Sequence, residues 1–247
     1  MAMILIENLV KRFGTFTAVD GIGFAVERGT VLGFLGPNGA GKSTTMKMVT
    51  GFLPPTSGTV RVCGHDVQAE PLEAKRRIGY LPEGAPTYPD MTPLGFLEFV
   101  ARVRGVSGTA RRAAIGRVVE QVELGAVLHQ PIDTLSKGFR RRVGLAQAIL
   151  HDPEVLILDE PTDGLDPNQK HEVRRLIRAM AADKAIVLST HILEEVEAVC
   201  SRALIIGRGK VLAEGVPVAA GWRFGGLEAA PGGLDALFRR ITLGEAA

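Results

Sequence analysis

The stretch GPNGAGKST, residues 36–44, decides the fold of this chain. It fits the phosphate-binding loop pattern G-x-x-x-x-G-K-[ST], in which glycines let backbone N–H groups turn inward with no Cβ in the way. These groups and the N-terminus of the following helix form a concave site for phosphate oxygens. Lys42 adds a point charge for the outer phosphates, and the Ser43 hydroxyl can ligate Mg²⁺. We therefore expect a nucleoside triphosphate along the loop, against Gly36, Pro37, Asn38, Gly39, Ala40, Gly41, Lys42, Ser43 and Thr44.

Both flanks of the loop support this interpretation. Residues 30–35 (TVLGFL) form an apolar run that is typical of a buried strand. Residues 42–50 predict a helix that ends at Gly51. Because strand, loop and helix follow in order, a glycine-rich turn that carries Lys-Ser by chance is the weaker interpretation.

The composition indicates one large core, alone or with a subdomain. The chain has 247 residues, 46% of them hydrophobic, and a formal net charge of +2 that attracts neither nucleic acid nor anionic lipid. No apolar run approaches the roughly 18 residues of a membrane-spanning helix. The apolar start, residues 1–14, lacks the basic region and cleavage site of a signal peptide. Cys63 and Cys200 lack metal-type spacing, which suits a reducing cytosol.

The N-terminal residues predict an antiparallel β-layer. Residues 3–10 and 22–26 have strand patterns, and residues 11–21 are expected to connect them. Within this connection an aromatic residue, Phe13, has the chemistry to stack on a flat ligand such as adenine. Phe16 is the alternative for that role, and a place in the core is the alternative interpretation of Phe13.

The middle of the chain predicts a helical subdomain inserted at about residues 90–150. A proline-rich loop, residues 82–93, precedes two amphipathic patterns. These patterns predict helices at residues 92–105, with Thr92 as N-cap and Pro93 in the first turn, and at residues 110–122.

A third helix of this region begins at Ser136, which can cap it. Its first turns carry the basic run Arg140, Arg141 and Arg142. We expect this run to form a solvated helix face, because no interleaved aromatic residues or further basic clusters accompany it.

The second half of the chain alternates strands and helices. An apolar run at residues 155–158 predicts a buried parallel strand that ends in two adjacent carboxylates, Asp159 and Glu160. Open α/β sheets bind ligands at that edge. The alternation predicts an α/β fold with a mostly parallel sheet, and residues 217–247 as a short appendage. Further strands are expected at residues 58–62, 78–81, 185–189, 202–206 and 211–213, and helices at residues 168–182, 192–199 and 234–241.

Several motifs in order give the chain a resemblance to the nucleotide-binding subunit of ATP-binding cassette (ABC) transporters, over about residues 3–216. After the phosphate loop come LSKGF, residues 135–139, similar to the family signature LSGGQ, and the second Walker motif VLILDE, residues 155–160. GLDP, residues 164–167, matches the D-loop, and STH, residues 189–191, matches the switch histidine. The stretch LSKGFRRRVGLAQA resembles ATPases paired with separate exporter permeases, including those linked to gliding motility.

The resemblance implies a P-loop NTPase core over residues 1–216 and an ATPase activity that uses ATP and Mg²⁺. Ser43 and Asp159 would hold Mg²⁺, and Glu83, in the loop after the YLP stretch, would ligate the metal and sense the γ-phosphate. Glu160 would polarise the attacking water, and His191 would touch the γ-phosphate.

The resemblance also implies a dimer. Phe13 would stack on the adenine of the chain's own ATP, whereas Ser136 and Gly138 would face the γ-phosphate bound by a partner subunit. Two ATP molecules would lie at the seam of a homodimer or of a pair of ATPase subunits. Such a protein would be cytoplasmic and peripheral, attached to the inner face of the cell membrane through an integral membrane permease.

The chain departs from the family pattern at three positions. Lys137 replaces the first glycine of the signature, and Phe139 replaces its final glutamine. Glu83 stands where the family usually has glutamine. These departures resemble the variant of the exporter subgroup.

Other interpretations of these residues remain. His191 can be a structural histidine, Asp166 can serve as a helix cap, and Asp159 with Glu160 can be an exposed strand end. For the whole chain, the alternatives are a soluble ABC ATPase that acts on nucleic acid or ribosomes and a small-molecule kinase. We do not expect nucleic acid as a partner, because the chain lacks the second cassette, coiled-coil insertions and basic arms typical of that class.

Overall fold

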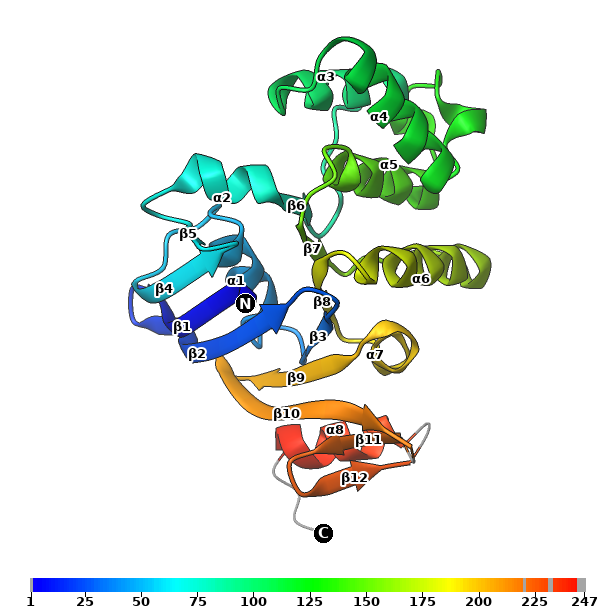
Figure 1. Ribbon diagram of the computed structural model, residues 1–247. Coiled ribbons are helices and arrows are strands. Elements are labelled where there is room, and N and C mark those ends of the chain that lie inside the picture. The colour runs from blue at the N-terminus through cyan, green and yellow to red at the C-terminus, as the bar shows by residue number, and fades with distance from the viewer. Residues whose placement is uncertain (1, 220, 231–232, 244–247) are drawn as a thin grey trace.

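The computed structural model describes residues 2–219, 221–230 and 233–243. Within these residues the strands form a four-stranded sheet in the order β2-β1-β4-β5 and an eight-stranded sheet in the order β12-β11-β10-β9-β3-β8-β7-β6 (Figure 1). The predicted fold class is confirmed: the chain is an α/β protein with an N-terminal antiparallel layer, a mostly parallel sheet and an inserted helical lobe.

The small sheet is antiparallel throughout its four strands, β1 (Ala2–Phe13), β2 (Phe16–Glu27), β4 (Ser57–Val62) and β5 (His65–Asp66). The connection expected at residues 11–21 is wrong. The β1–β2 ladder continues to the pair Phe13 and Phe16, so that only a tight turn separates the strands. Residues 11–17 are mostly exposed or half-buried, and they therefore lack the apolar alternation that identifies a strand in sequence.

The core of the large sheet is parallel, with β3 (Val31–Leu35) between β8 (Ala185–Thr190) and β9 (Arg202–Gly207). Beyond β8 lie β7 (Val155–Asp159) and β6 (Ile78–Leu81). Every residue of β3, β7 and β8 is buried, as expected for parallel strands that are covered on both faces.

Helices cover the two faces of the large sheet differently. The face toward the small sheet packs on α1 (Lys42–Val49), with Met46, Met48 and Val49 in the core between the sheets. The other face packs on α6 (Pro167–Ala181) and α7 (Leu193–Val199). The expected caps are confirmed: Thr92, Ser136 and Asp166 each accept a backbone N–H at the start of a helix, and Asp166 forms a capping box with Gln169.

The helical lobe consists of α3 (Pro93–Val103), α4 (Gly108–Gln121) and α5 (Lys137–Ile149), with short 3-10 turns at Gly125–Val127 and Ile132–Thr134. Figure 1 shows this lobe in green at one end of the molecule. A further helix, α2 (Pro71–Arg77), was not predicted, because Ala74 is its only buried residue and no apolar stripe marks it. No helix among the described residues is both long and apolar enough to cross a membrane.

The C-terminal residues extend the large sheet. Two strands that were not predicted, β11 (Gly221–Phe224) and β12 (Leu227–Ala229), pair antiparallel beyond β10 (Lys210–Val218). The expected helix is present as α8 (Leu234–Leu243), and it packs on β9, β10 and β12. The boundary expected after residue 216 falls inside β10, and the division into a domain and an appendage remains a prediction.

This arrangement predicts that the C-terminal strands unfold together with the α/β core. Phe224 is 2% exposed, stacks on Trp222 with 5.9 Å between ring centroids, and belongs to the same core cluster as Leu188 of β8. We expect Phe224→Ala to lower the free energy of unfolding by about 3–5 kcal/mol in denaturant titrations. Leu227→Ala, at a residue that is 37% exposed, is the control. An unchanged global midpoint for Phe224→Ala would mean that these strands fold separately.

Candidate active site

The phosphate loop connects β3 to α1, and its glycines are required by geometry at two positions. Gly41, the N-cap of α1, has a φ of 104°, and a Cβ built there would lie 2.6 Å from the carbonyl oxygen of Ala18. A Cβ at Gly36 would collide with the carbonyl oxygen of Ile206. At these two positions the loop passes close to β2 and β9 and leaves no room for a side chain.

Lys42 lies against this loop as the first residue of α1. Its side chain is buried, and its Nζ donates to the carbonyl oxygens of Gly36, at 2.7 Å, and Pro37, at 3.2 Å. Burial lowers the pKa of Lys42, whereas the carboxylates of Glu160, Asp159 and Glu83 raise it. The ammonium is thus placed beside the loop amides, at the position where phosphate charge would replace the carbonyl contacts.

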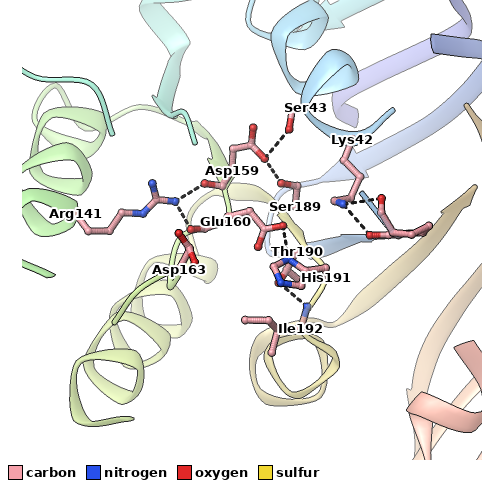
Figure 2. Close-up of polar contacts among 12 residues, drawn as sticks. Lys42, Ser43, Arg141, Asp159, Glu160, Asp163, Ser189, Thr190, His191 and Ile192 are labelled. Carbon is pink, nitrogen blue, oxygen red and sulfur yellow. Dashed lines mark hydrogen bonds and ion pairs between the residues drawn. The ribbon is translucent and has the colours of Figure 1, made fainter. Parts of the chain in front are cut away.

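Asp159 is the best candidate for a metal ligand. Its side chain is 1% exposed, and its Oδ1 accepts hydrogen bonds from the hydroxyls of Ser189 and Ser43, the latter at 3.4 Å (Figure 2). Its Oδ2 is buried and makes no hydrogen bond within the described part of the chain. A buried, unpaired carboxylate oxygen is costly unless a cation satisfies it. Asp159 and Ser43 therefore fit Mg²⁺, which binds proteins through one or two such oxygens and completes its shell with phosphate oxygens and water.

Glu160 directly follows β7 and has an unusual backbone conformation. Its φ of 50° lies in the left-handed region, which few residues other than glycine adopt and which often marks functional sites. Its N–H donates to the carbonyl oxygen of Ser189 at 3.0 Å. Its carboxylate Oε1 lies 2.9 Å from Nδ1 of His191, whose side chain is 51% exposed (Figure 2). The acid and the histidine predicted as catalytic residues therefore face each other at the open edge of the sheet.

Arg141 contradicts its predicted place on a solvated face. It is 5% exposed, and its guanidinium donates to the backbone carbonyls of Asp159 and Glu160 (Figure 2). It also donates to the carbonyls of Pro82 and Pro161, each at 3.2 Å. Its neighbours in the basic run are more accessible to solvent: Arg140 is exposed and Arg142 is half-buried. Burial lowers the pKa of Arg141. The burial of Arg141 could have been predicted from helical spacing, because Arg141 lies four residues before the buried Leu145 and therefore on the same helix face.

Ser189 is the second residue whose role was missed. It is fully buried at the end of β8, where it pairs in register with Asp159, and it holds both the Asp159 side chain and the Glu160 N–H. A serine that closes an otherwise apolar strand next to an acidic strand end was the available signal.

Two further predicted residues lie around the site. Glu83 is exposed in the loop after β6, and its charge raises the pKa of Lys42. Phe13 is 49% exposed near the tip of the β1–β2 hairpin, with Nζ of Lys11 at 5.2 Å from its ring centroid. The core alternative for Phe13 is therefore wrong. Phe16, at 63% exposed, stays an alternative for stacking on adenine.

The structure does not bring the signature residues to the chain's own phosphate loop. Ser136 is exposed and caps α5 by accepting the N–H of Phe139 at 3.3 Å. Gly138 is buried in the first turn of α5, where a Cβ would collide with the side chain of Gln169. Figure 1 shows α5 in the helical lobe, apart from α1.

Comparisons with known proteins agree with this geometry. The ABC transporter family matches residues 19–163. The Nod factor export ATP-binding protein I of Burkholderia orbicola (strain AU 1054) is 40% identical over 218 residues, which cover 88% of this chain and 72% of that protein. The probable multidrug ABC transporter ATP-binding protein YbhF of Escherichia coli (strain K12) is 40% identical over 212 residues, or 85% of this chain and 36% of that protein.

A solved structure of an ATP binding subunit of an ABC transporter has the same fold. It superposes with a TM-score of 0.81 at 29% sequence identity, over 87% of this chain and 90% of that one. The family match, the relatives and the fold agree with a site that combines a phosphate loop with a buried aspartate and an adjacent glutamate. This chain therefore belongs to the ABC transporter family, as an ATP-binding subunit that hydrolyses ATP.

Proposed function

We propose that this chain works as one of two ATPase subunits that close around two Mg-ATP and drive a separate membrane permease, in the direction of export. The observation that carries the proposal is the division of the site within one chain. The phosphate loop, Asp159 and Glu160 lie in the α/β core, whereas the capped start of α5 at Ser136 lies in the helical lobe. A second copy, arranged head to tail, supplies the missing half. Export is supported by the relative named as a Nod factor export protein.

Within each half-site, the residues would divide the work by position. The loop amides and Lys42 bind the phosphates, and Ser43 and Asp159 hold Mg²⁺, which neutralises charge on the phosphate oxygens. Glu160 accepts a hydrogen bond from the attacking water. His191, whose Nδ1 lies 2.9 Å from Oε1 of Glu160, orients that carboxylate and reaches the γ-phosphate. Phosphoryl transfer needs positioning more than covalent chemistry. The buried contacts that position Asp159 are therefore as important for turnover as the Glu160 carboxylate.

A groove of about 810 Å³ supports a permease partner. Its lining includes three strongly exposed apolar side chains, Phe52 at 75%, Leu72 at 69% and Val103 at 70%. Lys75, Arg76 and Arg104 add positive charge around them. Exposed apolar surface with a charged rim is typical of protein interfaces, and this one fits a short amphipathic helix with acidic residues. Tyr80, in the lining, belongs to β6, which leads into the loop of Glu83.

Replacement of the loop lysine tests nucleotide binding. We expect Lys42→Ala to weaken ATP binding roughly 10- to 100-fold in equilibrium titrations, because the charge-assisted contacts to the outer phosphates are lost. Lys47→Ala, an exposed lysine on the same helix, is the control and should bind ATP normally. Equal affinities for the two variants would contradict the role of Lys42.

Replacement of the catalytic acid separates binding from turnover. Glu160→Gln keeps the size of the side chain but removes the base, so ATP affinity should persist while phosphate release falls by at least about 100-fold. Glu194→Gln, an exposed acid on α7, is the control. Undiminished turnover in Glu160→Gln would exclude the glutamate as the base.

Purification from membranes tests the partner. The protein should co-purify with an integral membrane protein, and Phe52→Glu or Val103→Glu should release it while ATP binding is retained, because a charge is placed in an apolar contact. Leu212→Glu, at a residue that is 40% exposed on β10, is the control.

Two other outcomes would favour a different function. A salt-dependent affinity for nucleic acid without a membrane partner would favour the soluble ABC class, and a phosphorylated small molecule would favour a kinase.

A further inference from the structure

We infer that Lys137 and Arg141 of α5 form a two-cation clamp on residues 159–164, so that the position of Glu160 depends on the helical lobe. The inference rests on the proposed role of Glu160 as the residue that polarises the attacking water. It assigns both cations as positioning residues, which act on the reaction through the segment that carries Glu160.

Lys137 binds the far end of the segment. Its Nζ lies 2.8 Å from Oδ2 of Asp163, and this ion pair lowers the pKa of Asp163. The lysine stem lies directly over Gly164, which has a φ of 71°, and a Cβ at that position would collide with the last atoms of the lysine side chain. Gly164, which has no side chain, thus leaves room for the lysine side chain to reach Asp163.

Arg141 binds the near end of the segment. Its Nη2 donates to the carbonyls of Asp159 and Glu160, and its Nε donates to that of Pro161 at 3.2 Å. The remaining Nη1 donates to Pro82 at 3.2 Å, directly before Glu83. The planar guanidinium, which presents several donors in a fixed geometry, therefore joins three consecutive carbonyls around Glu160 to the loop that follows β6.

The two cations act as one unit because of helix geometry. Residues 137 and 141 are four apart, so both side chains project from the same face of α5. Between their targets the N–H of Asp163 donates to the carbonyl of Glu160 at 3.1 Å, which closes a turn. The left-handed backbone conformation of Glu160 is unfavourable for a non-glycine residue, and it is maintained only where surrounding contacts hold it. The clamp supplies this constraint from another lobe, and a rotation of α5 must move the catalytic acid.

A purely stabilising role does not explain Lys137. The side chains of Lys137 and Asp163 are 61% and 53% exposed, and ion pairs at such exposure contribute little to stability. The ion pair therefore serves to hold residues 159–164 in position. Its loss should change turnover rather than the unfolding midpoint. A direct contact of Lys137 with nucleotide is the competing role, and it differs in that Asp163 would not be needed.

A double-mutant cycle separates the clamp from these alternatives. We expect Lys137→Gln and Asp163→Asn each to lower the kcat for ATP by about 3- to 10-fold, with the KM unchanged, and the double variant to lose no more than either single one. Arg239→Gln, which breaks an exposed ion pair on α8, is the control and should behave like the parent protein. Arg141→Lys, which keeps the charge but loses the fork, should lower kcat in the same way.

Two further measurements complete the test. Amide hydrogen exchange should accelerate at residues 159–165 in the clamp variants and stay unchanged in Arg239→Gln. Combining Lys137→Glu with Asp163→Lys should restore kcat above either single reversal. Additive losses, or a raised KM in Lys137→Gln alone, would overturn the clamp in favour of a nucleotide contact. Parental kcat in Lys137→Gln and Asp163→Asn beside an inactive Glu160→Gln would overturn the clamp alone, whereas turnover by Glu160→Gln would overturn the role of Glu160 and the clamp with it.

Discussion

The structure depends on the alignment of three parallel strands that end at the same edge of one sheet. In the order β3-β8-β7, the register places Leu35 opposite Thr190 and Asp159 opposite Ser189. The phosphate loop, His191 and the two acids therefore emerge side by side, although they come from three segments that are far apart in sequence. Hydrogen bonds between the strands fix this alignment, because a shift of one residue would turn every buried side chain of β7 and β8 to the opposite face. The chemistry at the edge is thus held in place by the apolar core beneath it.

The same alignment explains how a buried carboxylate is tolerated. Asp159 sits at the last position of β7, where the apolar run ends and hydroxyls from Ser189 and Ser43 are within reach. One oxygen is satisfied by protein and the other is left for a cation. Glu160, one residue later, has left the strand and turned its side chain toward His191 at the solvent edge. The two adjacent acids therefore lie at different depths: the buried Asp159 fits a metal ion, and Glu160, at the solvent edge, fits its proposed role toward water.

Much of this could be predicted from sequence, because the signals were local. The phosphate loop, the central strands and the caps at Thr92 and Ser136 are set by neighbouring residues. The misses involve residues whose environment comes from distant segments. Arg141 is polar in a basic run, but its four acceptors come from residues 82 and 159–161, which only the tertiary fold brings together. Strands β11 and β12 are short and gain their burial from α8 and β9, so their own residues carry a weak pattern.

The proposed coupling between nucleotide and permease requires a part of the chain that contacts both. The groove and the catalytic edge are joined by β6, whose Tyr80 lines the groove and whose next turn contains Pro82 and Glu83. Arg141 spans from Pro82 to the carbonyls of Asp159 and Glu160. If one of these acceptors moved away, a buried N–H of the guanidinium would be left without a hydrogen-bond partner, which is costly. The loop and the segment that carries Glu160 are therefore expected to shift together. In the proposed complex, a displacement of the loop by a docked helix would therefore be transmitted to Glu160 through the four hydrogen bonds of Arg141.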